Sequence, residues 1–374
     1  MNKVALELQP CCGIRSGIGT YVYEIAKRLH DDDELEFYGN IFNFAGRHDN
    51  KESLNGISIP VKVNKLIPYK IYRSFGNVFH ISYDDIFPPK ADLTVFFNFI
   101  APPKISGCIM TAIHDLTYIH YPETMEKCNL RYLKKRLKDS AERSDKILTV
   151  SNFSKSEIQK YLEVPEEKIE IVHNAPSLSK ETADHTRVTE KFGIHGDYIL
   201  FVSTIEPRKN IVRLLHAFNY LRETKKIPHQ LVLAGGKGWN NREIYQVAGQ
   251  LKCADDVIFT GYVTAEEKNA LYEYADAFIF PSIYEGFGIP PLEAMLKGCP
   301  VICANTASLP EVVGDAAVLI NPFSIEEIAA GVLSVISDTK LRERLVQKGY
   351  ERAKMFSWDK SARQLTAICK EVLD

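Results

Sequence analysis

Short apolar runs and amphipathic stretches alternate along the first half of the chain. Val4–Leu8 and Leu93–Phe97 are short and mainly apolar, which predicts strands that are buried on both faces. Tyr21–Leu29 instead has apolar residues three or four positions apart, which predicts a helix with one buried face. Strands that alternate with helices predict a parallel sheet covered by helices on both faces. The other elements predicted in this half are strands at Ile109–Ile113, Ile147–Val150 and Ile169–Val172, and a helix at Ser156–Tyr161 after an N-capping signal at Ser151.

The same pattern restarts after a polar stretch, residues 177–196, that has no hydrophobic period. The sequence therefore predicts an α/β protein with two doubly wound, Rossmann-like domains, residues 1–176 and 197–356, joined by the linker 177–196. No strand follows the predicted helix 357–374, so this helix must pack on a part of the fold that is already built. Ligands bind beyond the carboxyl ends of the strands in such sheets, and a cleft between the domains is the expected active site. The strands predicted in this half are Tyr198–Val202, Leu231–Ala234, Val257–Thr260, Ala277–Phe280 and Val301–Cys303, and the helices are Leu214–Leu221, Ala265–Tyr274 and Pro290–Lys297.

Composition excludes several classes of protein. The chain has 374 residues, of which 45% are hydrophobic, and a formal net charge of −2, which argues against a generic nucleic-acid-binding protein. Its first residues, MNKVALELQP, lack the apolar core of a signal peptide, and no segment approaches the ~20 apolar residues of a membrane span. The eight cysteines lack zinc-site spacing and are expected as free thiols in a reducing compartment. We therefore expect a cytoplasmic protein.

The segment 280–294 carries the strongest chemical signal. It begins where a predicted strand ends, continues through a glycine-containing loop, and enters a helix that opens with two prolines. Backbone N–H groups at the first turn of that helix form a site for an anion such as phosphate, and Gly286 and Gly288 let the backbone approach a ligand. Glu285 and Glu293 flank the loop, where a carboxylate accepts hydrogen bonds from sugar or ribose hydroxyls. The alternative interpretation is a strand–turn–helix that binds no ligand and carries two acidic residues on its surface, which would have the same spacing.

Two cations follow the first predicted strand of the second domain. Arg208 and Lys209 stand at the carboxyl end of Tyr198–Val202, where they suit a diphosphate that gains negative charge as it leaves. A solvated basic turn is the alternative interpretation.

The first domain offers a glycine-rich loop and a histidine, each after a predicted strand. The loop Gly13–Gly19 lacks a full dinucleotide-binding fingerprint, because Val22 stands where the last glycine belongs, so a loop that faces a phosphate or an acceptor fits better than one that binds NAD. His114 follows Ile109–Ile113 and could bond a sugar hydroxyl or ease charge at the reacting carbon, although a lone histidine is more often structural.

Acidic residues predict no metal site, since the run 31–33 and the pairs 84–85 and 255–256 do not follow apolar strands. The segment Leu130–Ser144 has basic residues on one side and an apolar stripe on the other. It could touch an anionic membrane or a lipid-phosphate acceptor, or it could be an ordinary charged surface helix.

Several of these motifs, in this order, resemble a known family. The segment from Glu285 to Glu293, with seven residues between the acids, resembles the signature of the retaining glycosyltransferases of family 4. The segments Glu206–Asn210, Leu233–Gly236, Phe259–Val263 and Leu309–Gly314 are similar to that family as well, and Ser16–Tyr21 and Ile113–Asp115 to its bacterial mannosyltransferases of surface-polysaccharide synthesis. The resemblance covers nearly the whole chain. It implies a GT-B fold, with two Rossmann-like domains facing across a cleft and the helix 357–374 crossing back onto the first domain.

The resemblance also implies a role for each matching residue. Glu293 would hold the donor ribose and Glu285 the hydroxyls of the donor sugar, while Gly286, Phe287 and Gly288 would supply backbone contacts to sugar and phosphate. Arg208 and Lys209 would bind the diphosphate, and Gly17 and Gly19 would approach it from the first domain. Gly235 would belong to the donor site, Tyr262 and Val263 would lie near the base, and His114 would contact the transferred sugar.

The implied reaction moves a hexose from a nucleotide-diphosphate sugar to a saccharide or lipid-linked saccharide, in polysaccharide or O-antigen-type synthesis, with retention at the anomeric carbon and without a metal or other cofactor. Front-face displacement is favoured, in which the leaving phosphate takes the acceptor's proton. Mannose from GDP-mannose is the first expectation, and UDP-linked glucose, galactose or N-acetylhexosamine stay open. A sugar-nucleotide epimerase and a non-catalytic sugar-nucleotide-binding protein are the alternatives, and the enzyme is expected in the cytoplasm or on the inner face of the plasma membrane.

Overall fold

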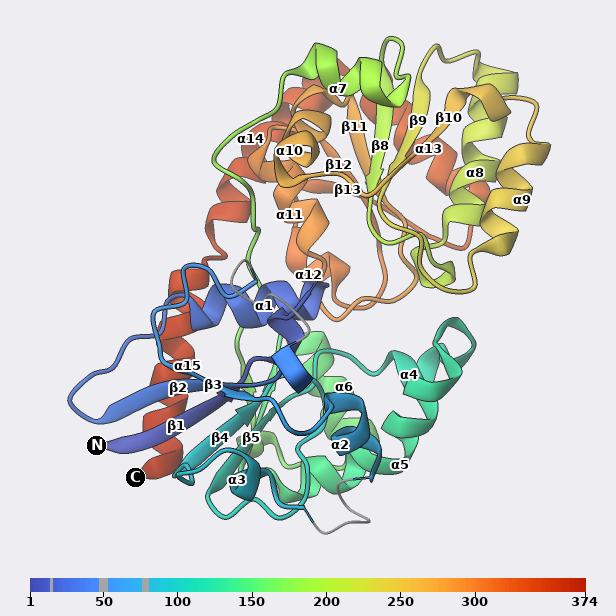
Figure 1. Ribbon diagram of the computed structural model, residues 1–374. Helices are drawn as coiled ribbons and strands as arrows, with labels where there is room; N and C mark the ends of the chain where they lie inside the picture. The colour runs from blue at the N-terminus through green and yellow to red at the C-terminus, as the bar shows by residue number, and fades with distance from the viewer. Residues whose placement is uncertain (14–15, 47–52, 76–80) are drawn as a thin grey trace. The chain divides into compact units, whose positions relative to one another are not determined.

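The computed structural model of the chain describes residues 1–13, 16–46, 53–75 and 81–374. The chain forms two compact units, and each is built around its own sheet (Figure 1). Unit 1 consists of Met1–Tyr118, Lys127–Asn174 and Ser357–Asp374, and unit 2 of Ile119–Glu126 and Ala175–Phe356.

Unit 1 contains a seven-stranded parallel sheet with the order β3-β2-β1-β4-β5-β6-β7. The interior strand β1 pairs with β2 on one side, Val4 opposite Phe37, and with β4 on the other, Val4 opposite Leu93. Helices cover both faces, so these residues are fully buried, which is why the strands are nearly continuous apolar runs. The strands are β1 (Asn2–Glu7), β2 (Leu35–Phe42), β3 (Val61–Asn64), β4 (Leu93–Phe96), β5 (Cys108–Ala112), β6 (Lys146–Thr149) and β7 (Ile169–Ile171). The helices of this part of the chain are α1 (Gly17–Ala26), α2 (Tyr69–Phe75), α3 (Tyr83–Ile86), α4 (Thr117–His120), α5 (Lys127–Arg143), α6 (Asn152–Leu162) and α15 (Trp358–Leu373).

The last helix belongs to unit 1, although it follows unit 2 in the sequence. Arg28 donates to Asp359 at 2.9 Å, and Lys370 pairs with Asp32 at 2.8 Å, while the apolar face of α15 is buried against the unit. The return of the last helix to the first sheet, which the resemblance implied, is confirmed.

Unit 2 contains a six-stranded parallel sheet with the order β10-β9-β8-β11-β12-β13. Its strands are β8 (Tyr198–Val202), β9 (Gln230–Ala234), β10 (Val257–Gly261), β11 (Ala277–Phe280), β12 (Val301–Ala304) and β13 (Ala317–Ile320). The helices are α7 (His185–Phe192), α8 (Ile211–Tyr220), α9 (Arg242–Gln250), α10 (Ala265–Tyr274), α11 (Ile289–Leu296), α12 (Leu309–Val313), α13 (Ile325–Ser337) and α14 (Thr339–Lys354).

Strand order reverses once in each sheet. The chain leaves β1 toward β2 and β3 and then returns to β4 on the other side of β1, so unit 1 reverses between β1 and β4. Unit 2 reverses between β8 and β11 in the same way. Open α/β sheets hold ligands in the crevice beyond the carboxyl ends of the strands at such a reversal, so each unit has one preferred position for a site.

Two local predictions from the sequence are wrong. The stretch 177–196, in which no helix was predicted, contains α7, which begins after an N-cap at Asp184 and ends before Gly193, which has a left-handed conformation. A short helix with a single buried apolar residue, Val188, leaves almost no hydrophobic period to detect. The glycine-rich loop is also shorter than expected: α1 begins at Gly17, because the Ser16 side chain caps it (residues 14–15 lie outside the described residues).

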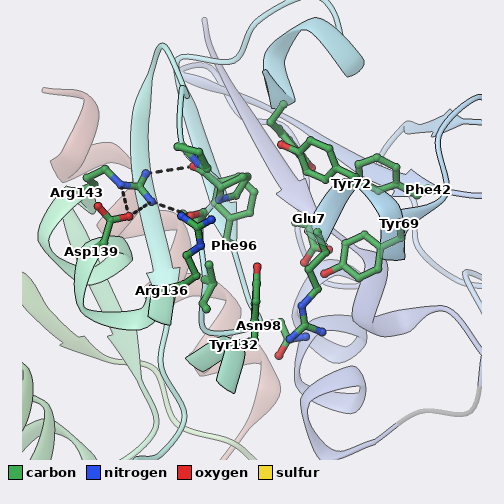
Figure 2. A pocket seen from close by; sticks show the side chains of 16 residues that line it. Glu7, Phe42, Tyr69, Tyr72, Phe96, Asn98, Tyr132, Arg136, Asp139 and Arg143 are labelled. Atoms are coloured by element: carbon green, nitrogen blue, oxygen red, sulfur yellow. Dashed lines mark hydrogen bonds and ion pairs between the residues drawn. The ribbon is translucent and has the colours of Figure 1, made fainter. Parts of the chain in front are cut away.

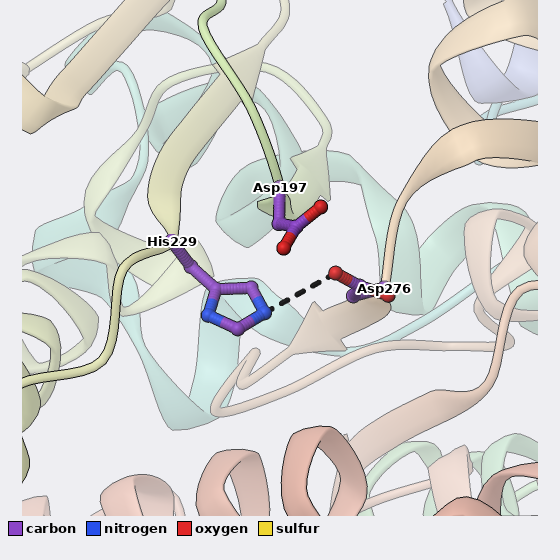
Figure 3. Close-up of side chains that lie close together, drawn as sticks. All are labelled: Asp197, His229 and Asp276. Atoms are coloured by element: carbon purple, nitrogen blue, oxygen red, sulfur yellow. Dashed lines mark ion pairs between the residues drawn. The ribbon is translucent and has the colours of Figure 1, made fainter.

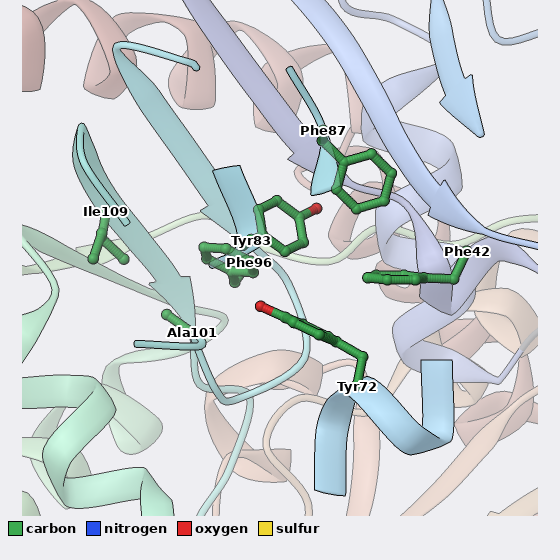
Figure 4. Packing of buried hydrophobic residues seen from close by; sticks show 7 residues of the cluster. All are labelled: Phe42, Tyr72, Tyr83, Phe87, Phe96, Ala101 and Ile109. Carbon is green, nitrogen blue, oxygen red and sulfur yellow. The ribbon is translucent and has the colours of Figure 1, made fainter. Parts of the chain in front are cut away.

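Aromatic rings form a buried cluster at the carboxyl end of the unit 1 sheet (Figure 4). Phe42, at the end of β2, stacks on Tyr72 with ring centroids 5.2 Å apart and meets Phe87 edge-on at 5.0 Å. Tyr83 meets Phe96, at the end of β4, edge-on at 5.1 Å. Such pairs hold rings in defined orientations, so the cluster fixes the end of this sheet.

The turn after β9 gives a first prediction about the fold. A Cβ atom at Gly235 would lie 1.8 Å from the Ser203 carbonyl oxygen, and its φ of +153° disfavours any side chain. Gly235→Ala is expected to lower the free energy of unfolding by about 2 kcal/mol or more in urea denaturation. Gly236→Ala is the matched control, because open space surrounds a Cβ there. Equal midpoints for the two variants would contradict the close approach.

Candidate active site

The loop between β11 and α11 lies at the strand reversal of unit 2. It runs from Phe280 to Gly288, where φ is +109°, and α11 begins at the next residue. The Ser308 hydroxyl donates to the carbonyl groups of Glu285 and Phe287, at 2.8 and 3.0 Å, and so fastens the loop from the side of α12. The loop is therefore held in place on both sides of its glycines.

A buried ion cluster joins this loop to the turn after β8. Arg208 donates to the Glu285 carboxylate at 2.8 Å and to the Tyr284 carbonyl at 2.6 Å, and Lys209 donates to the other Glu285 oxygen at 2.5 Å. Glu206 accepts a further hydrogen bond from Arg208 at 2.9 Å. The structure thus brings together three residues that the sequence placed in one site, although they come from segments more than 70 positions apart.

The cluster keeps Glu285 ionised. Burial by itself raises the pKa of this carboxyl, but the charges of Arg208 and Lys209, with hydrogen bonds from Lys209 and Ser282, outweigh it and lower the pKa to about 2. The side chain of Arg208 is 16% exposed and that of Lys209 8%, so Arg208 is the more accessible cation.

Glu293 lies on α11, the helix that directly follows this loop, and is buried. Its two carboxylate oxygens accept from the Lys268 ammonium at 2.7 Å and from the Tyr272 hydroxyl at 3.1 Å, both from α10. Binding a ribose through Glu293, as predicted from the resemblance, would therefore engage a carboxylate that α10 already orients.

The remaining predicted donor residues of unit 2 stand at the same edge of the sheet. Gly235 follows β9 and donates to the Gly261 carbonyl at the end of β10, at 3.0 Å. Tyr262 is 72% exposed, whereas Val263 is buried. Of the loop residues, Phe287 is buried and packs edge-on against Phe356, so its backbone rather than its ring is the group that can face a ligand.

Three polar residues of this site were not predicted from the sequence as members of it. Ser282 donates to Glu285 at 2.5 Å, Ser308 fastens the loop, and the Asn210 amide donates to the carbonyl groups of Pro281 and Pro322, at 3.1 and 2.6 Å. Asn210 has a φ of +61°, which asparagine tolerates better than most residues. The position of Asn210 directly after Arg208 and Lys209 could have indicated that it belongs to the site. Nothing in the sequence around Ser308 indicated that its side chain contacts the loop between β11 and α11.

The predicted site residues of unit 1 lie at the carboxyl edge of its own sheet. His114, after β5, is buried, and its Nε2 lies 2.8 Å from the Phe97 carbonyl oxygen. Since a carbonyl can only accept, Nε2 carries the proton, and burial lowers the pKa of the ring, so the imidazole is neutral. Gly17 and Gly19 form the first turn of α1, where backbone N–H groups suit an anion, and a Cβ at Gly17 would meet open space.

Helix α5, which contains most of Leu130–Ser144, buries its apolar stripe. Leu133, Leu137 and Ala141 are buried inside unit 1, and Lys138 pairs with Glu163 at 2.6 Å. Its outer face therefore offers charges rather than apolar side chains to a membrane, and such contact stays a prediction. Within the described ranges, no helix is long and apolar enough to cross a membrane.

One group of possible metal ligands lies at the opposite, amino edge of the unit 2 sheet. Asp197, His229 and Asp276 directly precede β8, β9 and β11, and their ligand atoms lie within 4.8 Å of one another (Figure 3). The sequence gave no hint of it, because the three residues come from separate strands. Asp276 already pairs with His229 at 3.2 Å and with Arg342 at 3.1 Å, and these contacts hold its pKa below the ordinary value, the His229 hydrogen bond most of all. Ion pairs within the protein therefore already engage two of the three residues, Asp276 and His229.

The ion cluster generates a prediction about stability and pH. Glu285→Gln leaves Lys209 buried without its anion, which is expected to cost about 3 kcal/mol in the free energy of unfolding at neutral pH. Because the pKa of Glu285 is lowered in the fold, its stabilisation is present above the ordinary value of 4.5 and is lost as the pH falls toward 2. The difference between the two proteins in urea denaturation should shrink over that window.

Two further variants test the cause. Glu285→Gln combined with Lys209→Met should recover part of the loss, because no unpaired ammonium then stays buried. Glu223→Gln removes an exposed pair with Lys252 and should change little. If the double variant were as unstable as the single one, the buried charge would not be the cause.

Comparisons with known proteins place the chain in a family. The family model described as "Glycosyltransferase Family 4" matches residues 15–180, and the model "Glycosyl transferases group 1" matches residues 186–352. The O-antigen chain mannosyltransferase B of Escherichia coli is 31% identical over 97% of this chain and 98% of its own.

Solved structures share the fold at lower identity. The sucrose-phosphate synthase of Thermosynechococcus elongatus superposes with a TM-score of 0.76, covering 100% of this chain and 99% of its own, at 18% identity. Anabaena HepE, in complex with UDP and glucose, superposes with a TM-score of 0.75, covering 99% and 100%, at 19% identity. The chain therefore belongs to glycosyltransferase family 4, has the GT-B fold, and is a glycosyltransferase related to the O-antigen mannosyltransferases.

Proposed function

We propose that the protein transfers mannose from GDP-mannose to a saccharide or lipid-linked saccharide acceptor, with retention at the anomeric carbon. The observation that carries the donor site is the cluster of Arg208, Lys209 and Glu285 at the strand reversal of unit 2. The choice of mannose follows from the E. coli relative, which is named for mannosyl transfer. The solved structure of Anabaena HepE contains UDP and glucose, so a UDP-sugar is the competing donor.

The two cations suit the departure of a nucleoside diphosphate. In front-face displacement, the bond between the anomeric carbon and the diphosphate oxygen breaks, and its electron pair leaves with the diphosphate. The acceptor hydroxyl forms the new bond on the same face and gives its proton to the leaving phosphate. Arg208 and Lys209, already fixed in place, would stabilise the growing charge on that phosphate without reorganising.

Glu285 suits binding better than nucleophilic attack. The Glu285 carboxylate accepts three hydrogen bonds, from Arg208, Lys209 and Ser282, which engage its charge and most of its acceptor positions and make it a weak nucleophile. It is oriented firmly, however, so that a hydroxyl of the donor sugar could hydrogen-bond to it. In unit 1, neutral His114 would contact the transferred sugar, and the first turn of α1 at Gly17 and Gly19 would approach the diphosphate.

Two other functions would leave different traces. A GT-B epimerase would convert the sugar nucleotide without any acceptor, and a non-catalytic binder would neither transfer nor hydrolyse it. Product analysis with and without a mannoside acceptor separates all three. Peripheral contact with an anionic membrane through the basic face of α5 stays part of the proposal.

A nucleotide screen tests the donor. In thermal-shift and calorimetric measurements, GDP and GDP-mannose should stabilise the protein more than UDP, ADP or NAD. Arg208→Ala should lower kcat by about 10² or more, because it removes a cation that this proposal assigns to the leaving phosphate. Arg222→Ala, which breaks an ion pair with Asp256 elsewhere in unit 2, is the control and should keep turnover. Stabilisation by NAD alone, or normal turnover of Arg208→Ala, would refute the assignment.

Metal removal tests the proposed independence from a divalent cation. Turnover and the GDP-induced thermal shift should be the same in EDTA as in magnesium, since cationic side chains take the place of the metal at the diphosphate. Loss of turnover in EDTA, restored by magnesium or manganese, would show that a metal bridges the donor.

A further inference from the structure

A second crevice lies at the strand reversal of unit 1, beyond the carboxyl ends of β1 and β4 (Figure 2). Glu7, the last residue of β1, and Phe96, the last residue of β4, both line it. We call this crevice the Glu7 pocket. It holds the position in unit 1 that the ion cluster holds in unit 2, which is where doubly wound sheets bind ligands.

One face of α5 lines this pocket with polar and charged side chains. Tyr132, Arg136, Asp139 and Arg143 line the pocket at spacings of three and four residues, so they form one stripe along the helix. From the sequence, the charged residues of α5 were predicted to form a single surface, facing either a membrane or the solvent. In the structure, Arg136, Asp139 and Arg143 line the pocket, whereas Lys134, Lys135 and Lys138 are exposed residues of the same helix.

The opposite wall is aromatic. Tyr69 and Tyr72 of α2 line the pocket, and Tyr72 is fixed by its stacking on Phe42. The Arg73 guanidinium lies over the Tyr132 ring, 4.0 Å from its centroid, so α2 and α5 meet across the pocket. The space that remains between these walls has a volume of about 50 Å³, a few times the ~10–15 Å³ that one water needs on the same measure.

Glu7 is one of two polar groups that line this pocket and lack a full set of hydrogen-bond partners among the described residues, the other being the Tyr83 hydroxyl. Glu7 is 5% exposed, and its buried Oε1 has no hydrogen-bond partner in the part of the chain that the structure describes. Burial raises the pKa of the carboxyl to about 8, and the charge of Arg73 and the Gln9 backbone N–H offset only part of that rise. A neutral carboxyl has one O–H to donate and an oxygen to accept, which matches a hydroxyl group. Keeping it buried without a full set of partners costs stability, which a purely structural role would not explain.

We propose that the Glu7 pocket binds the edge of one sugar ring of the acceptor, with Glu7 hydrogen-bonded to a ring hydroxyl. This inference rests on the proposed function, because it takes the acceptor to be a saccharide. Flat tyrosine faces pack on the C–H groups of a pyranose, and a carboxyl and a guanidinium side by side bind neighbouring hydroxyls. Glu7 is then a residue that selects the acceptor, and it takes no part in bond breaking.

The test uses the full chain and methyl α-mannoside as the probe, with saturation-transfer NMR as the readout. Glu7→Leu should weaken binding of the probe about tenfold, and Glu7→Gln should stay closer to the wild type because an amide still donates and accepts. Both variants should keep the GDP-induced thermal shift of the wild type. Unchanged probe binding by Glu7→Leu, or no probe signal from the wild type, would overturn the inference.

Thermal stability gives a second, independent readout. Glu7→Leu should raise the Tm by a few degrees, because it removes a carboxyl that the fold holds neutral at a cost. Asp84 is the matched control, since it is equally buried in unit 1 but accepts from the Ser106 backbone N–H at 2.8 Å and the Ser106 hydroxyl at 2.6 Å. Asp84→Leu should lower the Tm. A fall in Tm for Glu7→Leu as well would make Glu7 structural and overturn the inference.

The two proposals fail separately. If GDP stabilises the wild type but binding of the probe does not depend on Glu7, the proposal for the Glu7 pocket is refuted and the proposal for the donor site is retained. If no nucleotide stabilises the protein but probe binding depends on Glu7, the donor assignment is wrong and the pocket stands as a saccharide site.

Discussion

Each sheet reverses its strand order once, and that reversal decides where this protein can hold a ligand. At a reversal the connections leave the sheet toward opposite faces, so the carboxyl ends of two neighbouring strands stay uncovered. In unit 2 these are β8 and β11, and the turns that follow them supply Arg208, Lys209 and Glu285. In unit 1 they are β1 and β4, and β1 ends on Glu7. The rest of each unit, including the returning helix α15, supports these two edges.

The ion cluster of unit 2 shows how the edge becomes a rigid site. A buried charge is tolerated only when it is paired, so Glu285 and Lys209 can each stay inside only because the other is there. Their pairing fixes the β11–α11 loop against the turn after β8, and Ser308 fastens the same loop from a third segment. The contacts therefore fix the glycine backbone of the loop in one conformation, which is what the proposed stabilisation of a leaving group would require.

The sequence predicted the architecture better than the details of the sites. Unbroken apolar runs such as Tyr198–Val202 and Ala277–Phe280 have the bounds that the structure gives to β8 and β11, because strands buried on both faces need apolar residues throughout. Helix α7 escaped prediction because only one of its residues is buried. The motifs named Arg208, Lys209 and Glu285 separately, but the pairing that joins them depends on tertiary contacts between distant segments. Glu7 was not predicted as a functional residue and lay inside the predicted strand Val4–Leu8, since nothing local shows that two helices will enclose it.

Glu7 and Glu285 illustrate how tertiary surroundings divide two similar side chains. Both are glutamates at the carboxyl edge of a parallel sheet, and they are 5% and 8% exposed. Desolvation raises the pKa of each, yet the pKa of Glu7 is about 8 and that of Glu285 about 2. The difference comes from neighbours: Glu285 lies against two cations and a hydroxyl, whereas Glu7 has tyrosine rings around it and only the partial compensation of Arg73. One carboxyl is thereby fixed as an anion that can only accept hydrogen bonds, and the other is held as a neutral group that can also donate. Two groups whose pKa values are pushed apart in this way suit different parts of a two-substrate reaction, one beside the charged donor and one beside an uncharged saccharide.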